Sequence, residues 1–109
     1  MSFVATLVYE LHPNTPPETR KLFRAHLVGR RWLERCEGAP MPASALWMRR
    51  AAPERSTTDD VHAACARDVR DAAAAVAQAG REVKVLRVWI QVSGAGTYGL
   101  APIAPPSDA

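Results

Sequence analysis

The chain has 109 residues, of which 48% are apolar and 23% are charged, and its net charge is +3. This composition is typical of a globular protein and excludes wholesale disorder, while the length predicts one domain with one core. We assign this domain to residues 1–100 and expect residues 101–109 to form a flexible tail.

No apolar run reaches the roughly 18 residues that a membrane-spanning helix requires. The apolar residues at the N-terminus are not preceded by the charged region of a signal peptide. We therefore expect a cytoplasmic protein that has no membrane partner.

The positive charge is concentrated in the first half of the chain. Residues 1–55 contain nine Lys or Arg and five Asp or Glu, whereas residues 56–109 contain five and six. This asymmetry suits either a solvated basic face or an anionic partner such as RNA, and the small size of the excess favours the solvated face.

The first two elements have clear patterns. Residues 3–11 alternate in polarity and are rich in β-branched and aromatic side chains, which predicts an interior strand. Thr15 predicts the N-cap of a helix, with Pro16 at its first position and Glu18 completing a capping box. The helix should bury one stripe, Leu22, Phe23, His26 and Leu27, and expose three basic residues, Arg20, Lys21 and Arg24.

The segment that follows, residues 29–36, has two interpretations. If the helix continues, four arginines share a ridge suited to a phosphate backbone: Arg20, Arg24, Arg31 and Arg35. If Gly29 is the left-handed residue just beyond the helix, residues 30–36 form a second strand. Glycine within a helix costs about 1 kcal/mol relative to alanine, so we favour the helix end at Gly29.

The rest of the chain predicts two strands separated by a long helix. Residues 43–50 form a strand on which Leu46 and Met48 face the helices. Residues 56–60 offer a capping box in two registers, and the helix should end near Ala79, before Gly80. Residues 82–92 form the last strand, whose apolar face consists of Leu86, Val88, Ile90 and Val92.

Taken in order, these elements predict an α+β fold, a ferredoxin-like βαββαβ two-layer sandwich with both helices on one face of an antiparallel sheet. The other face of the sheet should be open and should mix aromatic with polar side chains. We predict a binding surface on this face or its rim: Arg31, Arg35, Trp47, Arg49, Arg87, Trp89 and Gln91. Monomers rarely leave such a patch in water, so a second copy of the chain or RNA should cover it.

The cysteines and histidines give weaker signals. Cys36 and Cys65 have no metal or redox spacing and should be small buried hydrophobes. His26 should be a packed core residue, and His62, three residues before Cys65, lies at the margin of a buried stripe. We expect no metal ion, no cofactor and no catalytic residue.

A glycine-rich run occupies residues 93–99. It follows a strand, but no helix follows it, so the dinucleotide-binding fingerprint lacks its required context. We predict a loop or a hairpin leading to an edge strand at residues 97–100, with a weak anion-binding nest as the alternative.

The layout resembles small ferredoxin-like nucleases of toxin–antitoxin and CRISPR systems, and most of all GhoS-type antitoxins. The local likeness lies in the first strand, which ends in Tyr9 and Glu10, and in residues 43–48. The resemblance implies RNA binding or cleavage on a dimeric sheet scaffold. Glu10 stands where the metal-dependent CRISPR-type nucleases have aspartate, so we carry over no catalytic residue.

Three functions follow as hypotheses. The first is a non-enzymatic binding domain that acts as a homodimer. The second is an RNA-binding or RNA-cleaving protein with phosphate contacts from Arg20, Arg24, Arg31, Arg35 and Arg49. The third is a small enzyme with a cleft around His26 or His62, which we rank last because neither histidine has an evident partner.

Overall fold

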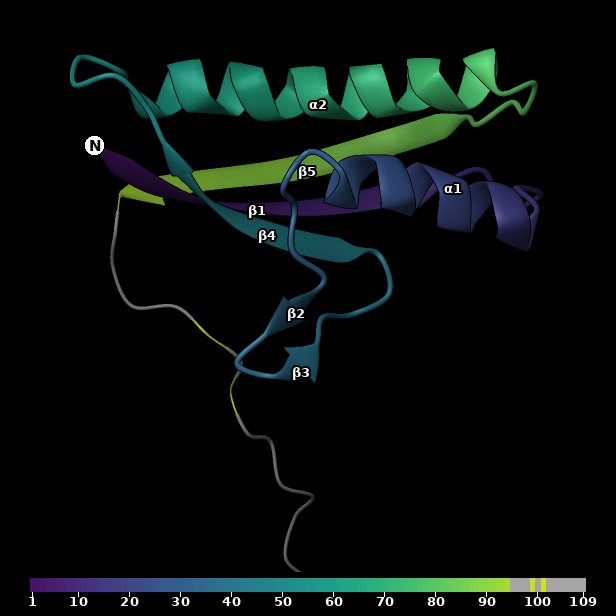
Figure 1. Ribbon diagram of the computed structural model, residues 1–109, viewed down its shortest axis with the longest axis horizontal. Coiled ribbons are helices and arrows are strands. Elements are labelled where there is room, and N and C mark those ends of the chain that lie inside the picture. Colours follow the sequence, from purple (N-terminus) through teal and green to yellow (C-terminus); the bar gives the residue numbers. More distant parts are fainter. Residues whose placement is uncertain (95–98, 100, 102–109) are drawn as a thin grey trace, which may run out of the picture.

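A computed structural model describes residues 1–94, 99 and 101. Strand β1 (Ser2–Leu11) lies in the centre of a three-stranded antiparallel sheet, between β4 (Ala45–Ala51) and β5 (Val85–Gly94). Helices α1 (Pro17–Val28) and α2 (Thr58–Gln78) lie on one side of this sheet (Figure 1). No helix in the described part of the chain has the length and apolarity needed to cross a membrane.

The core lies between the sheet and the helices. Alternate residues of β1 are buried against the helices, as are Leu46 and Met48 of β4, which confirms the predicted faces of both strands. The core side chains of the other elements are Phe23, Leu27, Trp32, Val61, Cys65, Val69, Ala72 and Val76. Of the predicted α1 stripe, Phe23 and Leu27 are buried, whereas Leu22 and His26 are only partly buried.

The predicted second strand is wrong over most of its length. Residues 29–31 form a turn, Leu33 makes an isolated bridge with Trp47, and β2 (Arg35–Cys36) pairs only with β3 (Ala39–Pro40). This short hairpin lies on the side of the sheet opposite α2 (Figure 1). The described chain is thus a mixed α+β fold with three strands in its main sheet, and the fourth strand of the predicted βαββαβ order is reduced to one bridge.

Both ends of α1 differ from the sequence prediction in detail. The helix ends at Val28 as expected, but Gly29 is right-handed (φ −62°), and the left-handed residue is Arg31 (φ 75°). At the other end Pro16 is the N-cap, and the Thr15 hydroxyl donates to the carbonyl of His12 at 2.6 Å instead of capping the helix. By contrast, α2 begins with a capping box between Thr57 and Asp60, one of the two predicted registers.

An irregularity in β5 changes the predicted face of one residue. Glu10 pairs with Arg87 but Leu11 pairs with Val85, so Leu86 falls in a register shift. Leu86 is consequently exposed, whereas Val85 packs at the margin of the core. A bulge of this kind reverses side-chain alternation locally and leaves no mark in the apolar pattern.

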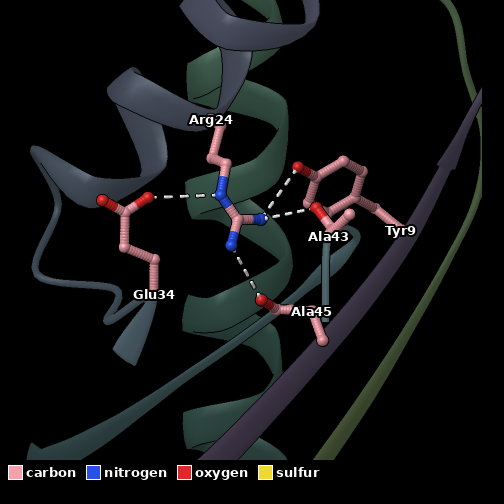
Figure 2. Close-up of polar contacts among 5 residues, drawn as sticks. All are labelled: Tyr9, Arg24, Glu34, Ala43 and Ala45. Atoms are coloured by element: carbon pink, nitrogen blue, oxygen red, sulfur yellow. Dashed lines mark hydrogen bonds and ion pairs between the residues drawn. The ribbon is translucent and has the colours of Figure 1, made fainter. Parts of the chain in front are cut away.

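Helical spacing predicts that Arg24 of α1 lies in water. In the structure its side chain instead binds groups on three other segments of the chain. Figure 2 shows its guanidinium donating to the carbonyls of Ala43 (2.8 Å) and Ala45 (3.3 Å), to the Tyr9 hydroxyl (3.3 Å) and to the carboxylate of Glu34 (3.2 Å). The helix is thereby fixed to the central strand, to the start of β4 and to the segment that precedes the hairpin.

A second polar cluster lies within the core. One carboxylate oxygen of Asp68 accepts from the indole nitrogen of Trp32 at 3.0 Å and from Arg50 at 2.9 Å. The Trp32 side chain is fully buried and Asp68 nearly so. This pairing lets the turn after α1 bury its tryptophan without leaving the indole N–H unsatisfied.

Replacing Arg24 with methionine should destabilise the fold by about 2 kcal/mol, because the carbonyls of Ala43 and Ala45 then lose a charged donor. The measurement is urea unfolding followed by circular dichroism. Arg70→Met is the matched control, since Arg70 is exposed on α2 and its loss should change stability by less than about 0.5 kcal/mol. Equal stabilities of the two variants would contradict the structural role of Arg24.

Asp68→Asn should cost about 2–3 kcal/mol, because it removes the charge that balances the half-buried Arg50. Asp71→Asn on the same helix is the control. Its pair with Arg30 is longer, at 3.5 Å, and solvated, so its loss should cost less than about 0.5 kcal/mol. Thermal unfolding of both variants decides the matter, and a large loss for Asp71→Asn would refute this ranking.

Candidate sheet-face binding site

The face of the sheet turned away from the helices brings together five of the seven predicted binding residues. In the strand register Thr6 lies between Trp47 and Gln91, and Val4 lies opposite Arg49. Val8 and Glu10 lie opposite Trp89 and Arg87. We call this surface, with members from β1, β4 and β5, the open sheet face.

The two tryptophans of this face have different surroundings. Trp47 is half-buried, and its indole nitrogen donates to the carbonyl of Arg35 at 2.8 Å, so the hairpin engages it. Trp89 is 54% exposed, and its neighbour Val8 is 42% exposed. The chain's own hairpin therefore contacts the β4 side of the face at Trp47, whereas Trp89 and Val8 on the β5 side are exposed among the described residues.

The charges on the β5 side of the open sheet face nearly balance. The Arg87 guanidinium lies 3.0 Å from the Glu10 carboxylate, and both side chains are largely solvated. Such a pair contributes little to stability, but it holds Arg87 across the strands beside Trp89. The β5 side of the open sheet face therefore presents Trp89, flanked by Gln91 and by an arginine that is paired with a carboxylate.

A hollow of about 560 Å³ lies at this end of the sheet. The open-face residues Val8, Glu10, Arg87 and Trp89 line it, together with Arg20 and Ser44 among others. The Arg20 guanidinium is held by the carbonyls of His12 and Thr15, both at 3.0 Å, so its charge is directed at the chain's own loop. The hollow is thus a mainly apolar depression with polar rims, the form that commonly receives a partner's side chain.

The other two predicted binding residues lie elsewhere. Arg31 is exposed in the turn after α1, and Arg35 lies in β2, where its guanidinium donates to the carbonyl of Gly38. The sequence predicts them on the sheet because it favours a strand at residues 30–36. Since that segment forms the turn and the hairpin, neither residue belongs to the open sheet face.

Sequence reasoning missed Val8 and Glu10 as site residues. Both lie on the first strand, on the face opposite the core, and the register places them against Trp89 and Arg87. The alternation of residues 3–11 already assigned them to that face. Only the strand pairing, which the sequence does not specify, shows that they adjoin the exposed tryptophan.

The nucleophilic and titratable residues form no catalytic arrangement in the described part of the chain. His26 is half-buried and His62 exposed, and neither makes a hydrogen bond or ion pair with a described residue. Cys36 and Cys65 are free and buried. Burial raises the pKa of the Cys65 thiol, an effect that the nearby Arg50 partly offsets. Among the described residues no group of histidine, cysteine and acidic side chains could hold a metal ion.

The glycine-rich run can be compared with its prediction only in part. Ser93 and Gly94 end β5, so the last strand extends two residues beyond its predicted end. The predicted edge strand at residues 97–100 and the tail at residues 101–109 lie almost entirely outside the described residues.

Because the folded Cys65 thiol holds its proton more tightly than the unfolded one, its contribution to stability is complete below the ordinary thiol pKa of 9.0. It is lost as the pH rises beyond that value towards the folded pKa. Urea unfolding at about pH 7 and pH 10 should therefore show a larger loss for the wild type than for Cys65→Ala. A Cys65→Ala variant with an undiminished loss would contradict the assignment.

Comparisons with protein-family models, with curated proteins and with solved structures found no match. The function is therefore argued from the geometry of the open sheet face.

Proposed function

We propose that this protein is a small, non-enzymatic interaction domain that acts as a homodimer and binds through the open sheet face or its rim. The observation that carries the proposal is the exposure of Trp89 beside Val8, at the edge of a hollow in an otherwise well-packed sheet. A large exposed aromatic side chain in an apolar depression has the features of an interface anchor.

The same geometry makes RNA a less favoured partner. Of the five arginines expected to contact phosphates, Arg20, Arg24 and Arg35 donate to carbonyl groups of their own chain. Arg31 and Arg49 make no hydrogen bond or ion pair with the described residues, but they lie on different segments, a turn and β4. The basic excess thus stabilises loops more than it forms a continuous positive surface.

We also propose that the fold is a variant of the ferredoxin-like βαββαβ arrangement in which the second strand has been reduced. The order β4-β1-β5 supports this interpretation, because the first predicted strand lies between the third and the fourth and the outer edge of the third is left for the second. The Leu33 bridge to Trp47 lies where the missing strand would pair. The hairpin then replaces an edge strand.

The homodimer predicts that Trp89→Glu weakens self-association by at least about 30-fold in Kd, as expected when a buried aromatic anchor is lost. The measurement is light scattering and sedimentation over micromolar concentrations. Leu33→Glu is the matched control, since Leu33 is 44% exposed but lies beyond β4, and it should leave the dimer intact.

A wild-type chain that is monomeric at these concentrations would refute the homodimer. RNA binding would instead require an affinity that falls with salt, by about 0.7 logarithmic units per tenfold increase for each single-strand phosphate contact. Such a slope, abolished by Arg49→Ala but not by Trp89→Glu, would favour the second function.

A further inference from the structure

We propose that the outer edge of β5 is the dimer seam, where β5 pairs antiparallel with the same strand of a second copy across a two-fold axis. This inference rests on the homodimer proposed above and specifies its geometry. It yields one continuous sheet of six strands in the order β4-β1-β5-β5-β1-β4.

The first argument is the contrast between the two edges of the sheet. At the β4 edge, Leu33 and Trp47 exchange both backbone hydrogen bonds, at 2.7 and 3.1 Å, so the chain itself covers that edge. On β5, nine residues pair with β1 on one side, and no described strand pairs on the other. A row of unpaired N–H and C=O groups of this length is a template for another strand.

The second argument is that exposed apolar side chains adjoin this edge on both faces of the sheet. Trp89 belongs to the open sheet face, whereas Val88 pairs with Tyr9 on the helix face and is nevertheless 36% exposed. Leu86, in the register shift, is 44% exposed. A strand added at the edge would therefore contact apolar side chains above and below its backbone.

The third argument is electrostatic and explains why two copies of a positively charged chain can meet at this edge. The chain carries a net charge of +3, so two copies repel each other unless they meet at a neutral surface. The only charged residue on β5 is Arg87, and Glu10 of the adjacent strand lies 3.0 Å from it. Natural edge strands often carry charged residues, proline or bulges to prevent pairing. In β5 the charged residue Arg87 and the irregularity at Leu86 both lie near the start of the strand, and residues 88–94 contain neither lysine nor proline.

The symmetry of such a seam makes it testable, because antiparallel strands related by a two-fold axis bring only one position close to its own copy. Single cysteines are introduced along the strand as Leu86→Cys, Val88→Cys, Trp89→Cys, Gln91→Cys and Ser93→Cys. Each variant is treated with a short bifunctional thiol reagent at a concentration where light scattering shows the dimer. Arg49→Cys and Leu33→Cys are the controls on β4 and beyond it, and the wild type reports on the two buried native thiols.

The seam predicts that the cross-linked dimer is most abundant at one position on β5 and falls at least tenfold within two or three residues on either side. The controls should give no cross-linked dimer. A dimer in light scattering that cross-links through Arg49→Cys, and not through β5, would overturn the seam while leaving the homodimer intact. A monomer in light scattering would overturn both proposals.

A charge variant provides an independent measurement. The double substitution Leu86→Lys with Val88→Lys places two like charges on each copy at the seam, so it should raise the dimer Kd at least 100-fold. Circular dichroism confirms that the monomer is folded. A folded variant that dimerises as well as the wild type would overturn the seam.

Discussion

The guanidinium of Arg24 is the contact on which the arrangement of the middle of the chain depends. It joins α1 to the central strand at Tyr9, to the segment before the hairpin at Glu34 and to the carbonyls of Ala43 and Ala45 at the start of β4. Two of these acceptors are backbone groups at a strand end, where the sheet supplies no donor. The planar guanidinium thereby supplies a donor at the start of β4, where no second strand is present to supply one.

The absence of a full second strand beside β4 shapes the open sheet face. Because residues 30–36 do not form a full strand, β4 would be left with an exposed edge, and the chain covers that edge with the Leu33 bridge and the Trp47 hydrogen bond to Arg35. The β5 side has no such cover among the described residues. In the described chain the sheet is consequently paired at Trp47 on one edge and unpaired and largely apolar on the other, and this asymmetry underlies the proposal that β5 pairs with a second copy.

Sequence patterns specified what depends on alternation and helical periodicity. They gave the helix end at Gly29, the α2 capping box, the buried faces of β1 and β4 and the shared face of Trp47, Arg49, Arg87, Trp89 and Gln91. They failed where a residue's partner is distant in the chain. Trp32 looked like a strand residue because nothing nearby shows that its indole reaches Asp68, and the bulge at Leu86 leaves both neighbouring patterns intact.

The arginines show that predictions of function fail for the same reason, since their partners are distant in the chain. Helical spacing placed Arg20 and Arg24 in water, where they would be available to phosphates, but loop carbonyls brought close by the tertiary fold bind both side chains. A guanidinium has five N–H donors and no acceptor, so a few loop carbonyls are enough to engage it. Net charge alone therefore overstates the number of guanidinium groups that this chain leaves without partners in its own fold. What remains accessible on the β5 side is largely uncharged and aromatic, and such a surface favours a partner that also contributes apolar side chains and a free strand edge.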